Sequence, residues 1–319
     1  MLRFNVGIAL LKLVACSGVI SLHFGGAGFL RKPAVPTFVF IGFYLSARLF
    51  SQWDFNRLLK RLYRLAVPFV AWGLLSLLCW GMTGNEVSLE MVSQQLLCGR
   101  TADVPAAHLY YLEVCIILTA VLYFVPRRRQ DLLLVVLIVL LFVWQYSNLN
   151  YRVFNRLGYV AMNTFGRISE LGTYACTGIL FANFLPLVSR RKWFWWTCPV
   201  AFGLSCAVYV LQMIPTPSGF SYQGVSVFLL TVSLNAPVIL LGEILMCREG
   251  VMSSGFVTRL KYVASLTSGM YYMHMLVGTA AVWILGLAHS FALAVIIFVV
   301  CAVLTAFARR FKWLYWLVA

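Results

Sequence analysis

Apolar segments long enough to cross a bilayer follow one another along nearly all of the 319 residues. A helix rises about 1.5 Å per residue, so about 17–25 apolar residues span the hydrocarbon core. About ten segments have this length: 4–25, 34–50, 66–83, 107–125, 131–147, 166–186, 193–213, 223–246, 262–286 and 291–308. Charged residues make up only 11% of the chain, against about 25% in soluble domains. The pattern predicts an all-α, polytopic membrane bundle of about ten transmembrane helices, with residues 1–319 forming a single domain.

The basic residues lie almost entirely between the apolar segments, and this explains a formal net charge of +16 without a nucleic-acid partner. When the loops between the spans are assigned alternately to the two sides of the membrane, one side carries 18 Lys and Arg and the other carries five. The larger set is Arg3, Arg48, Arg57, Lys60, Arg61, Arg64, Arg127 to Arg129, Arg190, Arg191, Lys192, Arg248, Arg259, Lys261, Arg309, Arg310 and Lys312. Basic connections stay in the cytoplasm. We therefore predict that both termini are cytoplasmic.

The nine cysteines lie mostly inside apolar segments, with no CxxC or Cys/His spacing. They are expected to pack as small buried hydrophobic residues rather than to bind a metal. Lys12 interrupts the stretch that a cleaved signal peptide keeps apolar, which favours an uncleaved first helix. The GxSxG, Walker A, GxGxxG and HExxH motifs are missing, so the sequence does not indicate a bound metal or cofactor.

Ionisable side chains inside the spans are candidate functional residues, because charge is costly to bury in a membrane. They are Lys12, His23, His108, Glu113, Arg167, Glu170, Glu243 and His274. Lys12 and His23 are eleven residues apart, which places them within about 20° of one helix face and about 16 Å apart along the axis. The alternative is that Lys12 extends to the cytoplasmic interface while His23 caps the outer end of the helix.

Other members of this set also have structural explanations. Arg167 and Glu170 share a helix face and can neutralise each other, so a structural ion pair joining two helices competes with a catalytic role. His274 follows Tyr271 in a partly polar stripe, where a hydrogen-bonded packing residue is the alternative. Glu113 lies near the outer end of its span, where contact with water is the alternative explanation.

A basic segment follows the second span, in a predicted cytoplasmic loop. Its residues Arg57, Lys60, Arg61 and Arg64 lie along one side if the segment is helical. Forked guanidinium groups suit phosphate oxygens. Anionic lipid headgroups, together with topology, are the alternative explanation for these charges.

Five segments, in this order, resemble the acyltransferase 3 family of bacterial membrane O-acyltransferases. Residues 11–23 (LKLVACSGVISLH) are similar to a family segment in which a basic residue is followed by ten residues and then by a histidine. Residues 35–46 (VPTFVFIGFYLS) and 60–72 (KRLYRLAVPFVAW) resemble its VPLFFxISGFYLS and KRxxRLxxPYxxW segments. Residues 108–112 (HLYYL) and 268–274 (SGMYYMH) resemble HLWFL and SxGIYLxH. The sequence departs at Lys12, where arginine is more usual, and at Ile41, where the family has a serine before glycine.

The resemblance implies transfer of an acyl group, commonly acetyl from acetyl-CoA, to a hydroxyl of a surface polysaccharide or lipid-linked glycan. It implies a multi-pass protein of the bacterial cytoplasmic (inner) membrane, with acyl-CoA as co-substrate and no bound cofactor. His23 would act as general base or acyl carrier, with Lys12 holding the donor or stabilising negative charge. The acyl-CoA phosphates would meet Arg61 and Arg64, supported by Arg57 and Lys60. Acceptor or supporting residues would be His108, Glu113, Arg167, Glu170 and His274.

Two other functions remain open from the sequence. A glycan or lipid transporter or flippase would also need buried charges, although the inverted repeats and matching broken spans typical of transporters are missing. The departures at Lys12 and Ile41 also allow a family member without catalysis.

Overall fold

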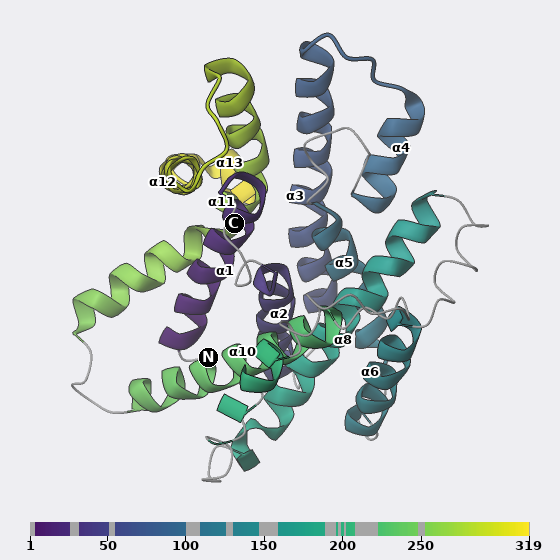
Figure 1. Cartoon of the computed structure of the whole chain (residues 1–319), viewed down its shortest axis with the longest axis vertical. Coiled ribbons are helices and arrows are strands. Elements are labelled where there is room, and N and C mark those ends of the chain that lie inside the picture. The colour runs from purple at the N-terminus through teal and green to yellow at the C-terminus, as the bar shows by residue number, and fades with distance from the viewer. Residues whose placement is uncertain are drawn as a thin grey trace.

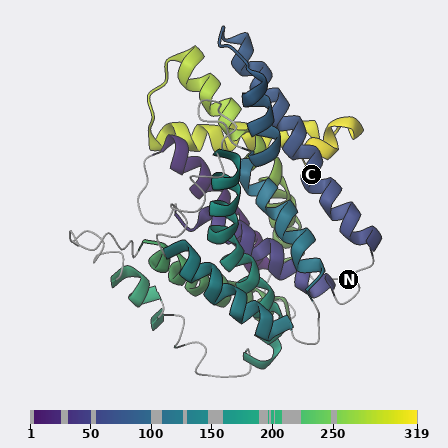
Figure 2. The same ribbon diagram turned by 90° about the vertical axis from the view of Figure 1, so that its right-hand side faces the viewer.

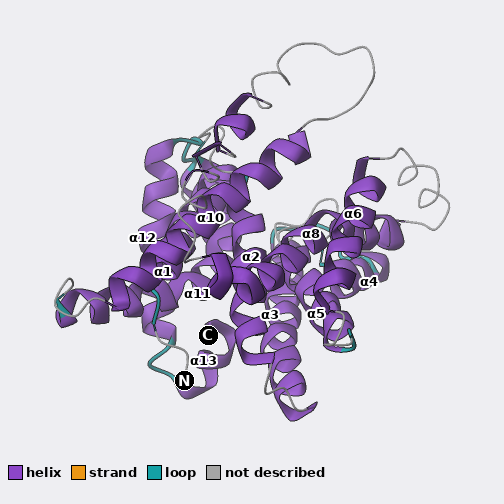
Figure 3. Cartoon of the chain, turned by 90° about the horizontal axis from the view of Figure 1, so that it is seen from below, coloured by secondary structure: helices purple, strands orange, loops and turns teal. Residues whose placement is uncertain are grey.

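The computed structural model describes residues 4–25, 32–50, 55–99, 109–125, 130–146, 159–188, 196, 199–200, 202–207, 223–247 and 253–318. Its main helices are α1 (Val6–Phe24), α2 (Ala34–Phe50), α3 (Phe55–Met82), α4 (Leu89–Cys98), α5 (Tyr110–Tyr123), α6 (Gln130–Tyr146), α8 (Tyr159–Val188), α10 (Gln223–Cys247), α11 (Ser254–Leu285), α12 (Phe291–Ala308) and α13 (Lys312–Val318) (Figure 1). These ranges contain no strand (Figure 3). The predicted all-α class is confirmed.

Several of the helices suit a membrane. Within the described ranges, four helices are long and apolar enough to cross one, namely α1, α3, α12 and residues Val225–Met246 of α10. Ala34–Ala47, Tyr110–Tyr123 and Gln130–Trp144 form shorter apolar helices. The chain is therefore a membrane protein with several apolar helices. Three expectations stay predictions: the ten spans, the cytoplasmic termini and the single domain. Most of the expected span 193–213 lies outside the described residues.

Three helices differ from the expected segments. The basic segment does not lie in a loop, because α3 begins at Phe55 and continues without a break into the apolar span. Likewise α11 begins at Ser254, before Arg259 and Lys261. Hydropathy marks only the apolar part of a helix, whereas Arg, Lys and Leu all favour helix wherever it begins. In the expected connection 84–106, Ser88 caps the short helix α4 by accepting a hydrogen bond from the Met91 N–H at 3.2 Å.

The segment of α2 that carries the GFYLS motif lies inside the bundle. α2 packs against α1, α8 and α10 (Figures 1 and 2). Phe40, Phe43 and Tyr44 are completely buried there. At Gly178 of α8 a Cβ would overlap the Phe40 carbonyl, so the two backbones touch. Small residues allow such close approach between membrane helices.

The free cysteines fit the expected packing role. Cys16, Cys115, Cys176 and Cys301 are buried, and Cys79 and Cys206 are partly exposed. All six are unbridged. They therefore act as small hydrophobic side chains in this part of the chain.

Close backbone contact also fixes α1 against α10. The Asn5 side chain caps α1 by accepting a hydrogen bond from the Ile8 N–H at 3.0 Å, and its amide donates to the Ile239 carbonyl at 2.9 Å. A Cβ at Gly7 would overlap the Val238 carbonyl. Because α1 carries Lys12 and His23 farther along, this contact sets the position of both.

Replacing Gly7 with alanine is expected to destabilise the folded protein by about 1–3 kcal/mol, because the added methyl group forces α1 away from α10. The measurement is the temperature at which purified protein loses its monodisperse gel-filtration peak. Gly255→Ala is the control, since nothing lies within 4 Å of a Cβ at that helical position. Equal melting of the two variants would contradict the proposed contact.

Candidate active site

Two histidines from distant parts of the sequence meet inside the bundle. His23, in the last turn of α1, and His274, in the middle of α11, have ring centroids 5.4 Å apart with planes inclined by 40°. His274 is completely buried, and His23 is half-buried. The sequence predicted both residues as candidates, and the structure brings them together.

The contact between α1 and α11 explains this pairing. Phe24, next to His23, is 4% exposed, and its ring would overlap any Cβ at Gly278. Gly278 lies one helical turn after His274, so a notch in α11 receives the Phe24 ring. The Phe24 ring also meets the His274 ring edge to face, with centroids 6.5 Å apart. Packing of Phe24 therefore positions the His23 imidazole.

A backbone contact fixes the protonation of His274. Its Nδ1 lies 2.5 Å from the Tyr271 carbonyl oxygen. Since a carbonyl oxygen only accepts, Nδ1 carries a proton, and in the neutral form of the ring Nε2 is the acceptor nitrogen. The Tyr271 ring lies 5.7 Å from His274 and 5.3 Å from Tyr111. The imidazole thus borders an aromatic wall shared by α5 and α11.

Lys12 lies in the first half of α1, and the interfacial alternative for its side chain stays a prediction. It is half-buried, between the buried residues Leu11 and Ala15 along the helix. Within the described ranges no carboxylate oxygen lies within 4.0 Å of its ammonium group. On α10, the half-buried carboxylate Glu243 accepts a hydrogen bond from the Tyr44 hydroxyl at 2.9 Å, which ties α10 to α2.

The four basic residues of α3 do not act as one group. Arg61 turns into the bundle, where its guanidinium donates to the Ser46 hydroxyl and to the Gly42 carbonyl at 3.4 Å. It also lies 5.5 Å from the Phe43 ring centroid. The other three residues, Arg57, Lys60 and Arg64, are exposed. Arg61 therefore joins α3 to α2, and its neighbours face outward.

A pocket of about 420 Å³ lies beside two of these outward residues. Its lining residues are Leu59, Lys60, Tyr63 and Arg64 of α3 and Trp316 of α13. The Tyr63 and Trp316 rings meet edge to face, with centroids 6.1 Å apart. Cationic and aromatic side chains therefore share one concave surface.

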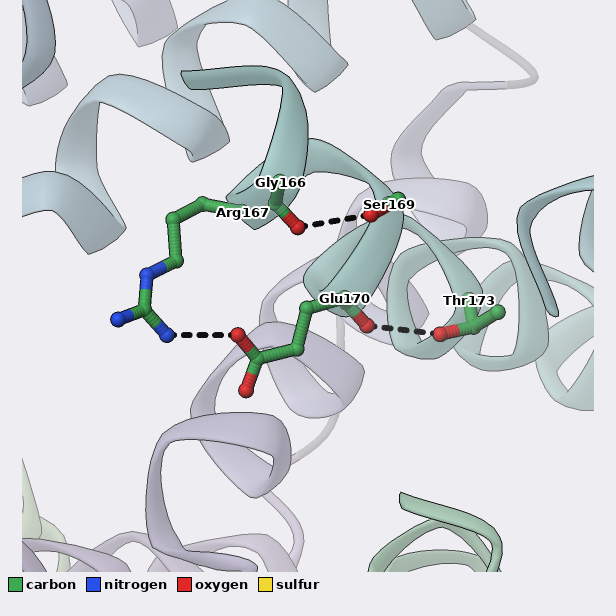
Figure 4. A network of polar contacts seen from close by, with 5 residues as sticks. All are labelled: Gly166, Arg167, Ser169, Glu170 and Thr173. Carbon is green, nitrogen blue, oxygen red and sulfur yellow. Dashed lines mark hydrogen bonds and ion pairs between the residues drawn. The ribbon is translucent and has the colours of Figure 1, made fainter. Parts of the chain in front are cut away.

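The candidates of α5 and α8 form a second polar group. Arg167 and Glu170 make an ion pair of 2.7 Å within α8 (Figure 4), rather than the pair joining two helices that was considered above. Their side chains are 29% and 38% exposed, so polar ligands can reach them. The Arg167 guanidinium also lies 4.5 Å from the Tyr110 ring centroid.

The buried carboxylate Glu113 joins this group from α5. It is 5% exposed and accepts a hydrogen bond from the Thr164 hydroxyl at 2.7 Å. Its other oxygen, Oε2, has no hydrogen-bond partner among the described residues. The predicted candidate His108 lies outside the described residues, so its place in this group stays a prediction.

Sequence reasoning missed Gln95, which is 1% exposed on α4. Both polar atoms of its side-chain amide lack a hydrogen-bond partner within the described part of the chain. The side chain lies against Gly73 of α3. A serine cap at Ser88 and a glycine stop at Gly99 mark α4 in the sequence, and these signals identify the helix that carries Gln95.

The fold and the site together define a class of protein: an all-helical membrane protein whose ionisable side chains gather at a few points in and around the bundle. The chain belongs to the acyltransferase 3 family, because that family's acyltransferase domain matches residues 5–310. The suspected resemblance is thus confirmed over nearly the whole chain. No curated protein and no solved structure shows significant similarity to it.

Proposed function

We propose that this protein transfers an acyl group, most simply acetyl, from acyl-CoA to a hydroxyl of a surface polysaccharide or lipid-linked glycan at the bacterial inner membrane. The observation that carries the proposal is the contact between His23 and His274, with ring centroids 5.4 Å apart. Each histidine closes one of the segments that resemble the family. A paired imidazole centre inside apolar helices suits proton transfer during acyl exchange.

In the direct route, His23 takes the proton from the acceptor hydroxyl while that oxygen attacks the thioester carbonyl carbon. The carbon–sulfur bond then breaks, and the CoA thiolate recovers the proton from the His23 imidazolium. The positive charge of Lys12, about 16 Å from His23 along α1, holds the donor. In the alternative route the imidazole itself carries the acyl group, and rapid-quench detection of acyl-histidine separates the two.

The donor enters at the basic end of α3. Lys60 and Arg64 line the pocket there, and their charges suit the phosphates of CoA. Arg61 supports the site by holding α2 against α3 through Ser46. The acceptor site would use Arg167, Glu170 and Glu113, because sugar hydroxyls both donate and accept hydrogen bonds.

Purified protein in lipid nanodiscs is expected to release CoA from acetyl-CoA when a matching glycan is present, with the label appearing on the glycan. Mass spectrometry of surface glycans from a deletion strain and its parent identifies the acceptor. A transporter moves an unmodified glycan and leaves the thioester intact. Stable acetyl-CoA in the presence of the parental glycans would therefore reject acyl transfer.

A further inference from the structure

The last helix, α13, lies beyond residue 310, where the family match ends, yet it is firmly docked on the bundle. The Trp72 indole N–H donates a hydrogen bond to the Leu317 carbonyl at 2.8 Å. Val318 is 2% exposed, and its side chain contacts the surface of α11 at Gly269. The position of α13 against α3 and α11 is therefore well defined (Figure 2).

The chain reaches α13 through an anchored turn. Arg309, just after α12, donates a hydrogen bond to the Ser265 hydroxyl of α11 at 2.6 Å. Its guanidinium also lies 6.0 Å from the Tyr315 ring centroid. These contacts hold both ends of the turn, so α13 presents one fixed face to α3.

That face completes the pocket at the basic end of α3. Trp316 and Tyr63 are 47% and 58% exposed, so aromatic surface remains open to a ligand after the two rings meet. Lys60 and Arg64 lie on the α3 side of the same pocket. Its volume of about 420 Å³ lies within the range of about 300–1,000 Å³ usual for small-molecule sites.

The lining residues select for two chemical groups in one ligand. Ammonium and guanidinium groups bind phosphate oxygens. Indole and phenol rings bind flat bases by stacking. A lipid headgroup supplies the phosphate but no flat ring, whereas the nucleotide end of CoA supplies both groups.

Resting on the function proposed above, we propose that α13 forms the adenine-binding wall of the donor site. Trp316 stacks on the purine, and Lys60 and Arg64 hold the phosphates of the same nucleotide. Helix α13 is then a specificity element that distinguishes intact acyl-CoA from shorter thioesters, although it lies outside the matched domain.

The test measures equilibrium binding of adenosine 3′,5′-bisphosphate and of 4′-phosphopantetheine to the full chain in phosphatidylcholine nanodiscs. Trp316→Ala is expected to weaken nucleotide binding roughly tenfold or more, because a stacked base is lost. Binding of phosphopantetheine, which has no base, is expected to be unchanged. Trp313→Ala is the matched control, since Trp313 lies on the same helix, is 72% exposed and does not line the pocket.

Equal nucleotide affinity in the Trp316→Ala and Trp313→Ala variants would overturn the proposal, as would a parent protein that does not bind the nucleotide. Nanodiscs that contain phosphatidylglycerol test whether the pocket prefers the phosphate of a lipid headgroup or that of a nucleotide. Complete loss of nucleotide binding in them would assign the pocket to lipid headgroups and reject the nucleotide, whereas persistent binding supports it. Acyl transfer is measured separately, in the parent and in the Trp316→Ala variant. If the parent transfers acetyl and the variant has the parental KM for acetyl-CoA, the role of α13 is refuted but the proposed function is not.

Discussion

Alanine in place of His23 is expected to lower the rate of acyl transfer by about 10²–10⁴-fold, because the acceptor hydroxyl loses its base or the acyl group loses its carrier. The variant is expected to fold, since His23 is half-buried and no hydrogen bond from its ring supports the described helices. The measurement is the initial rate of labelled acetyl transfer from acetyl-CoA by protein purified to equal amounts.

The control for this prediction is His289→Ala. His289 is an exposed imidazole at the same end of α1, with its ring centroid 5.8 Å from that of Phe24. Loss of this side chain is expected to leave the rate close to that of the parent. A His23→Ala protein that transfers acetyl at the parental rate would remove His23 from the mechanism.

Valine in place of Gly278 is expected to reduce acyl transfer about 10²-fold, although this residue has no chemistry of its own. Its side chain would overlap the Phe24 ring, and the displaced ring would carry the neighbouring His23 away from His274. The protein is also expected to melt earlier, since added volume in a packed interior costs about 1–3 kcal/mol.

A double variant tests this positional explanation. Phe24→Leu removes the outer ring atoms that a side chain at position 278 would meet. Combined with Gly278→Val, it is expected to recover part of the lost rate, so that the two changes together cost less than their sum. Gly255→Val serves as the control, because a Cβ there meets nothing within 4 Å. Strictly additive losses would show that Phe24 does not transmit the effect.

The basic segment illustrates how far spacing alone can predict a site. The sequence correctly placed Arg61 and Arg64 in a helix-compatible pattern and treated them as equivalent ligands of phosphate. In the structure Arg61 contacts Ser46 of α2, whereas Arg64 lines the pocket. Which side of α3 meets α2 depends on the packing of other helices, so spacing within one helix does not reveal it.

The pocket wall supplied by α13 was also beyond the reach of the sequence. Trp316 belongs to a short apolar helix after the last predicted span, with no motif to distinguish it from Trp313. Only docking through Trp72 and Val318 brings it opposite Tyr63. Gln95 is similar, because burial of its amide on α4 follows from contact with α3.

The sequence by itself determined that this chain is helical, that it is a membrane protein and that it resembles membrane acyltransferases. Each of these properties resides in single segments, since hydrophobic length fixes a segment's preference for the bilayer and local motifs identify the family. The tertiary structure alone decided that His23 meets His274, 251 residues away along the chain. Lipid tails are as apolar as the side chains of the helices, so hydrophobicity does not select helix partners. Close packing selects them, through contacts such as Phe24 in the notch at Gly278.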